Sequence, residues 1–410
     1  MNLQAHSTAE AVARRSYGKL VAFLAVRTHD VSAAEDALSE AFASALADWP
    51  QNGCPSNPEA WLLTVARRKF IDITRRQHSS VATLDLEQVA EILNAPPDDG
   101  EIPDRRLALM FACAHPAIDS AIRAPLILQV ILGLDAAAIA SAFLMSPTAM
   151  GKRLVRAKNK IREAGIPFRI PEREELPERL DTVLEAIYAA FSEGWIDAAG
   201  TDVGRRDLAE EAIFLCRLVI ELLPSEPEAL GLLALMLYAE ARRPARRSAE
   251  GEYVPLAEQD STLWDWQMID EAETLLARAS ALGTIGRYQI EGALQSAHVC
   301  RRRTGHANAE AILQLYDALL ALSSSPVVAI NRALAIAELH GARAALDAIE
   351  KVAAEDRLAA YQPYWAARAE LLARIGAHAE ACHAYEIAIG LEHDPSVRRF
   401  LQSRQSALSS

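Results

Sequence analysis

The segment PTAMGKRLVRAKNKIR, residues 147–162, contains the residue types of a nucleic-acid contact. It holds six Lys and Arg residues and no acid, and its apolar residues form only a narrow stripe. A short apolar segment, LDAAAIASAFL, and a four-residue turn ending at Ser146 precede it. A cationic helix in this position is what a helix-turn-helix presents to the major groove of DNA. The alternative is an ordinary basic helix face in contact with solvent.

The charge distribution favours a DNA-contacting helix over an ordinary basic helix face. The net charge of the chain is −13, yet residues 1–164 hold 18 Lys and Arg against 18 Asp and Glu, so the whole surplus of acid falls in residues 165–410. Residues 30–48 hold five acids and no base, whereas residues 61–77 carry a net charge of +4. Two basic helices separated by acidic stretches predict two DNA contacts, with the other surfaces kept away from DNA.

The composition narrows the class of protein. At 410 residues the chain predicts two or three domains. No apolar run of spanning length and no amino-terminal signal pattern is present, which predicts a cytoplasmic protein without membrane contact. The five cysteines form no CxxC pair, so neither a disulfide framework nor a zinc module is indicated. No Gly-rich phosphate loop or nucleophile elbow is found, which predicts a protein that is not an enzyme and needs no cofactor or metal.

The spacing of apolar residues predicts an all-α fold, because three- and four-residue intervals recur throughout and no strand-like alternation is present. Helices are expected at 59–77, 105–113 and 120–132. The Gly, Pro and Asn content of residues 50–58 predicts a loop, and Asn57-Pro58 is a plausible helix start. Prolines in 79–104 and 164–178 predict a linker and a tether.

The carboxyl-terminal half has an internal period. Seven residues match the spacing of a tetratricopeptide repeat, with a turn glycine between two helices: Trp365, Ala369, Leu372, Gly376, Ala381, Tyr385 and Ala388. Gly341 precedes Gly376 by one repeat length. Such arrays usually bind a peptide, a protein or another part of the same chain, and plain helical packing without a ligand is an equally good interpretation.

Two further clusters have structural explanations. Cys113 and His115 are close enough to suggest a metal, but two ligands without a second pair favour buried packing. Glu193, Asp260 and Asp265 lie near tryptophans in the expected extension. Hydrogen bonding between helices is a better explanation for these carboxylates than a ligand pocket.

Three segments together resemble a known family. Residues 34–42, AEDALSEAF, resemble the acidic helix of region 2 in extracytoplasmic-function sigma factors of bacterial RNA polymerase. Residues 60–76, AWLLTVARRKFIDITRR, resemble the part of region 2 that reads the promoter −10 element. Residues 133–160 are similar to region 4, which reads the −35 element. The remainder resembles the long helical extension with tetratricopeptide-like repeats that some of these sigma factors carry.

The resemblance implies a role for individual residues. It implies that five residues contact the β′ clamp helices of core polymerase: Glu35, Asp36, Leu38, Glu40 and Phe42. It implies that the −10 strand is contacted by Arg67, Arg68, Lys69, Arg75 and Arg76, with loop 50–58 accepting a flipped base. In region 4 it implies that Ser146 caps the recognition helix, that Thr148, Lys152, Arg153 and Arg156 face the groove, and that Lys158 faces phosphate. The β flap of the polymerase is a further expected partner.

The resemblance also implies domain boundaries and a function. Region 2 is expected at 9–78, an acidic linker at 79–104, region 4 at 105–163 and the extension at 179–410. The implied function is that of a sigma factor, which brings core polymerase to promoters and is regulated through its own extension. The alternative is a one-component transcription activator with a repeat-type sensor. The acidic extension either folds back on regions 2 and 4 as an attached inhibitor or is required for activity, and its size favours the second.

Overall fold

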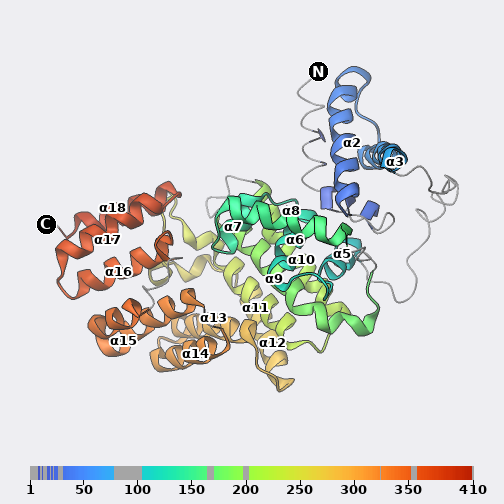
Figure 1. Ribbon diagram of the computed structural model, residues 1–410. Helices are drawn as coiled ribbons and strands as arrows, with labels where there is room; N and C mark the ends of the chain where they lie inside the picture. The colour runs from blue at the N-terminus through green and yellow to red at the C-terminus, as the bar shows by residue number, and fades with distance from the viewer. Residues whose placement is uncertain are drawn as a thin grey trace. The chain divides into compact units, whose positions relative to one another are not determined.

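The computed structural model describes residues 31–77, 104–163, 170–196, 203–323, 325–351 and 358–408, with scattered positions between 8 and 25 (Figure 1). The predicted linker at 79–104 lies outside this part except for its last residue, Asp104. The all-α prediction is confirmed: the described ranges contain helices and no strand, apart from one isolated antiparallel bridge between Arg247 and Tyr253. None of the described helices is long and apolar enough to cross a membrane.

The chain divides into two compact units, residues 1–194 with 204–222 and residues 195–203 with 223–410. The described helices of unit 1 are α2 (Val31–Asn52), α3 (Pro58–Gln77), α5 (Arg105–Cys113), α6 (Ser120–Val130), α7 (Ala136–Ala142), α8 (Pro147–Glu163), α9 (Leu176–Ile196, whose last two residues belong to unit 2) and α10 (Val203–Leu222). Those of unit 2 are α11 (Pro227–Ala241), α12 (Trp266–Ala281), α13 (Arg287–Thr304), α14 (Ala309–Leu322), α15 (Pro326–Glu350), α16 (Gln362–Arg374), α17 (His378–Leu391) and α18 (Pro395–Ser406).

Helices α2 and α3 form a hairpin. The rings of Trp49 and Trp61 meet edge to face with centroids 5.5 Å apart. The expected loop at 50–58 is shorter, because α2 continues through Pro50 to Asn52. Gly53 then takes a left-handed φ of 86° and its N–H donates to the Trp49 carbonyl at 3.0 Å, which ends the helix. The expected cap of α3 is confirmed, since Asn57 Oδ1 accepts a hydrogen bond from Ala60 N at 3.1 Å.

Helix α5 is covered on every side. Its residues from Leu107 onward, together with the following Ala114, each expose 2% or less of their surface. A helix at the surface of a domain would leave one face in solvent, so α5 is a central helix. It is contacted by α6 and also by the two helices that follow α8 in sequence, α9 and α10. The boundary between the compact units thus lies after α10, within the segment predicted as the extension, 179–410.

The contacts of α9 and α10 with α5 are polar and specific. The guanidinium of Arg179, which is 2% exposed, donates from Nη1 to the Phe111 carbonyl at 3.1 Å and from Nη2 to Glu175 at 2.9 Å. Arg106 at the start of α5 lies 2.5 Å from a carboxylate oxygen of Glu211 on α10. Buried charges need such partners, because an unpaired guanidinium in the interior is costly.

Unit 2 is a chain of helices in which each packs on its neighbour in sequence, from α13 to α18 (Figure 1). Helix α11 contacts both α12 and α13 and is buried continuously from Ala229 to Tyr238. The two predicted turn glycines have left-handed backbones: φ is 84° at Gly341, where two helices meet within α15, and 81° at Gly376, between α16 and α17. Small residues fill the α16–α17 contact as expected, although the assignment to tetratricopeptide repeats stays a prediction.

Carboxylates near the tryptophans of unit 2 act as helix caps. Asp265 Oδ1 accepts hydrogen bonds from Gln267 N and Met268 N, both at 3.0 Å, at the start of α12. Asp260 Oδ1 accepts from Thr262 N at 2.8 Å. These bonds are made within a few residues of each carboxylate. The bonding between helices that was expected of Asp260 and Asp265 is therefore wrong for these bonds, which are local helix caps.

The approach of α11 to α13 requires a glycine. A Cβ at Gly231 would lie 2.6 Å from Gln289 N and 2.9 Å from its Cα, and backbone atoms cannot move aside. We expect Gly231→Ala to lower the free energy of unfolding by about 2–3 kcal/mol, measured by urea denaturation. The matched control is Gly390→Ala in α17, where no atom lies within 4 Å; it should raise stability by about 0.5–1 kcal/mol. Equal stabilities for the two variants would contradict this packing.

Candidate functional site

The segment from α7 to α8 has the geometry expected from the sequence. Asp135 Oδ1 accepts from Ala137 N at 2.9 Å and from Ala138 N at 2.8 Å, which starts α7. A four-residue turn follows, in which Leu144 has a φ of 51°. Ser146 Oγ accepts from Ala149 N at 3.3 Å, so the expected cap of the next helix is present. Met150 and Leu154, each 1% exposed, fix the inner face of α8.

The outer face of α8 is cationic. Thr148, Lys152 and Arg156 are exposed and stand four residues apart, so they follow one another along one face of the helix. Arg153 is also exposed, to one side of this row. Four of the predicted −35 residues are thereby brought together on one accessible surface.

The sequence analysis missed Val155 on this outer face. Its side chain is 60% exposed, between the cations at 153 and 156. The signal was available, because position 155 lies off the stripe defined by Met150 and Leu154. An exposed apolar group beside cations is suited to contact with a thymine methyl group.

Lys158 is not part of this accessible row. Its Nζ lies 2.6 Å from Glu35 Oε2, and the two side chains are only 19% and 14% exposed. Burial raises the pKa of Glu35 above its usual range, and the nearby ammonium group offsets part of that rise. A predicted phosphate contact and a predicted polymerase contact are therefore bound to each other, which links α8 to α2. The predicted roles of Lys158 and Glu35 stay predictions, and each requires this ion pair to open.

The remaining residues predicted to contact polymerase divide into three classes. Asp36 and Glu40 are exposed on α2. Phe42 is half-buried, and its ring centroid is 6.3 Å from that of Tyr17. Leu38 is fully buried, so its side chain belongs to the core and does not form part of an accessible docking surface. Burial of Leu38 follows from its place on the inner face of α2, which the local sequence did not distinguish from the outer face.

The residues predicted to contact the −10 strand lie on α3. Arg68 is exposed, and Arg67 is half-buried, with its pKa lowered by desolvation. Lys69 Nζ forms an exposed ion pair with Glu40 Oε2 at 3.2 Å. Arg75 and Arg76 belong to the last turns of α3, but their side chains lie outside the described part.

The Cys113–His115 segment has local structural roles. Cys113 is fully buried, and desolvation raises the pKa of its thiol, which disfavours the thiolate that metals bind. His115 Nδ1 accepts a hydrogen bond from Ala117 N at 3.1 Å. Among the described residues, no group of three potential metal ligands occurs.

Comparison with known proteins identifies the family. Sigma-70 region 2 matches residues 12–80, which include α2 and α3. A family of unknown function, DUF6596, matches residues 179–280, from α9 to α12. An uncharacterized protein of Rhizobium meliloti (strain 1021) is 37% identical over 382 residues, covering 92% of this chain and 90% of that protein. No solved structure matches the chain significantly. The region 2 match covers both the acidic helix and the basic helix, and it makes the chain a member of the sigma-70 family.

Proposed function

We propose that the chain is a sigma factor of the extracytoplasmic-function type, a non-catalytic subunit that directs core RNA polymerase to promoters. The family assignment supports binding of core polymerase and promoter DNA in general. The observation that carries the finer proposal is the accessible row of Thr148 and the cations Lys152 and Arg156 on α8, in the same compact unit as region 2. This pairing of two DNA-contacting elements suits the joint recognition of −10 and −35 elements.

In this proposal α2 docks on the β′ clamp helices through its exposed acids. The charges of Asp36 and Glu40 fix the register of α2 on the clamp helices, and the partly exposed Phe42 provides an apolar contact. The exposed cations of α3 contact the −10 strand, with Arg68 as the most accessible of them. Helices α7 and α8 act as the helix-turn-helix of region 4, which also approaches the β flap.

The extension is proposed to be required for activity and not only to shield DNA-binding helices. The support is that Arg179 of α9 and Glu211 of α10 bind α5, the central helix of the unit that carries α7 and α8. The repeat-like helices of unit 2 continue from this anchored pair and are proposed to tune transcription. A one-component activator would use the same α7–α8 segment, and assembly with core polymerase distinguishes the two functions.

Reversal of one exposed charge tests the docking face. We expect Asp36→Lys to slow association with core polymerase about tenfold, because it removes an attractive charge and adds a repulsive one at the rim of the interface. Surface-immobilised core polymerase and the full-length variant give this rate directly. The matched control is Asp347→Lys, an equal charge change at an exposed position of α15. Equal rates for wild type and Asp36→Lys would place the polymerase-binding face elsewhere.

A further inference from the structure

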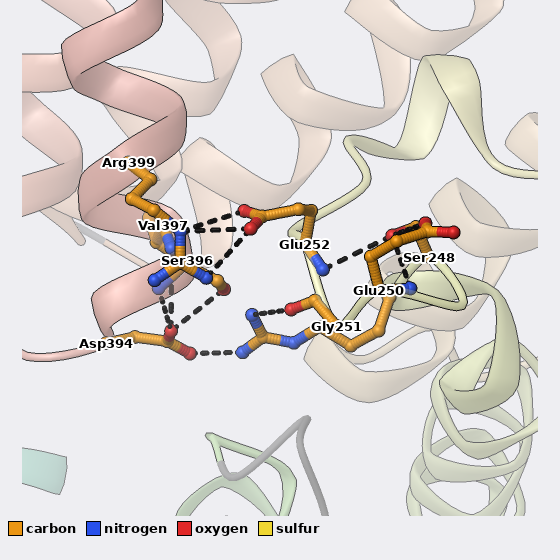
Figure 2. Close-up of polar contacts among 9 residues, drawn as sticks. Ser248, Glu250, Gly251, Glu252, Asp394, Ser396, Val397 and Arg399 are labelled. Atoms are coloured by element: carbon orange, nitrogen blue, oxygen red, sulfur yellow. Dashed lines mark hydrogen bonds and ion pairs between the residues drawn. The ribbon is translucent and has the colours of Figure 1, made fainter.

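Four arginines occur within six residues at the end of α11: Arg242, Arg243, Arg246 and Arg247. Two of them are neutralised by carboxylates. Arg243 Nε donates to Glu240 at 2.8 Å. Arg247 forms an ion pair with Asp394 at the start of α18. Figure 2 shows this end of α18, with Asp394 facing the loop that carries Gly251 and Glu252, and Arg399 reaching Glu252.

Among the described residues, Arg242 and Arg246 bind only neutral oxygens. Arg242 is 7% exposed, and its Nε and Nη2 donate to the Tyr238 carbonyl at 3.0 Å and to Gln295 Oε1 at 2.6 Å. Arg246 donates from Nη1 to the Trp195 carbonyl at 2.8 Å, and its guanidinium lies 3.6 Å from the centroid of the Trp195 ring. Desolvation lowers the pKa of both guanidinium groups to about 10. In the part of the chain that the structure describes, one buried and one half-buried positive charge are thus left without a counter-charge, which is energetically costly.

The unused hydrogen-bonding groups at this cluster are all donors. Within the described part of the chain, Nη1 of Arg242 and both Nε and Nη2 of Arg246 make no hydrogen bond, and these atoms keep contact with solvent. Trp195 Nε1 and Arg247 Nε are buried without a partner. Buried polar groups are normally satisfied, so the two buried donors, Trp195 Nε1 and Arg247 Nε, indicate a missing acceptor. Water would accept the hydrogen bonds but would leave both charges uncompensated.

We propose that Arg242 and Arg246, backed by Trp195, form a binding site in unit 2 for a phosphate group. A phosphate carries a charge of about −1.5 to −2 near neutral pH, which matches two guanidinium cations. Its oxygens accept the paired, planar N–H donors that arginine presents, and the stack on Trp195 holds one guanidinium in place. The group is either inorganic phosphate or the phosphate of a small organic ester. This site is independent of the function proposed for α2, α3 and α8.

Calorimetric titration of the full-length protein tests the proposal, with inorganic phosphate and adenosine monophosphate as probes and chloride added to equal ionic strength. We expect saturable binding that is weakened about tenfold or more in Arg246→Met, because one charged fork of donors is lost. The matched control is Arg278→Met, which removes the same charge from an exposed position of α12 and should leave binding unchanged. Tighter binding of the nucleotide would identify an ester as the ligand, and equal affinities would identify the free anion.

Lys152→Ala separates this site from the cationic face of α8. Phosphate binding that survives in Arg246→Met and is lost in Lys152→Ala would overturn the proposal, as would a titration heat that chloride reproduces. Circular dichroism checks the fold of each variant. If Arg246→Met is misfolded, Arg246→Lys replaces it: the charge is kept but the planar fork is lost, and we expect several-fold weaker binding. Wild-type affinity in Arg246→Lys together with Arg242→Lys would also contradict the assignment.

Discussion

Replacing Arg153 and Arg156 by Ala should weaken promoter binding roughly a hundredfold at physiological salt. Both side chains are exposed on α8, and in the proposed function each makes a charge-assisted bond to a base edge or a phosphate. Losing two cationic contacts should also reduce the slope of log affinity against log salt by about 2. Fluorescence anisotropy with a labelled promoter duplex, at several salt concentrations, measures both quantities.

Two comparisons make this result specific to the exposed face of α8. Lys158→Ala removes a cation from the same helix, but one that is bound to Glu35, so its effect should be several-fold smaller. Arg343→Ala removes an exposed cation from α15 and should have no effect. Two results would show that the DNA-binding surface is not on α8. One is unchanged affinity in the Arg153/Arg156 double variant, and the other is an equal loss of affinity in that variant, in Lys158→Ala and in Arg343→Ala.

Truncation after Gly165 should abolish promoter binding through loss of the fold of α5 to α8. The truncated chain lacks α9 and α10, which supply Arg179 and Glu211 to the fully buried α5. Exposure of the large apolar surface of α5 to water would remove much of the stability of a small helical domain. We expect the cooperative thermal transition of this segment, followed by circular dichroism, to disappear, and promoter affinity to fall to the nonspecific level.

A point substitution tests the same contact in the intact chain. Arg179→Met keeps most of the side-chain volume but leaves the Phe111 carbonyl without its donor, and should lower the free energy of unfolding by about 2–3 kcal/mol. Arg343→Met, at an exposed position, should change it by less than about 0.5 kcal/mol. If the chain ending at Gly165 folds and binds promoters like the full-length protein, α9 and α10 are not part of the DNA-binding unit.

Local features of the fold were predictable from the sequence because they depend on residues close together in the chain. Asn57 and Ser146 cap the helices that they precede, and Gly376 takes the left-handed conformation that its turn requires. The cationic face of α8 follows from the periodicity of its apolar stripe, which buries Met150 and Leu154. Each of these outcomes is decided within one or two helical turns.

Contacts distant in sequence were not predictable. Nothing in the sequence near Lys158 indicates Glu35, which lies 123 residues away, as its partner. Leu38 and Asp36 occur in the same acidic helix, and only the tertiary packing around α2 decides that one is buried and the other exposed. The grouping of α9 and α10 with α5 likewise depends on two buried or half-buried arginines, whose side chains read from sequence as ordinary surface charges.

Transcription reconstituted from purified components tests the central claim most directly. Core RNA polymerase, a template library of promoter regions and the full-length protein are combined, and run-off transcripts are sequenced. A sigma factor should form a stoichiometric complex with core polymerase and produce transcripts from a defined set of promoters with shared −10 and −35 elements. Those transcripts should be lost with Asp36→Lys at limiting protein and with the Arg153/Arg156 double variant. Promoter-specific transcripts that depend on another sigma factor, with this protein bound to DNA but not to core polymerase, would contradict the account and favour an activator.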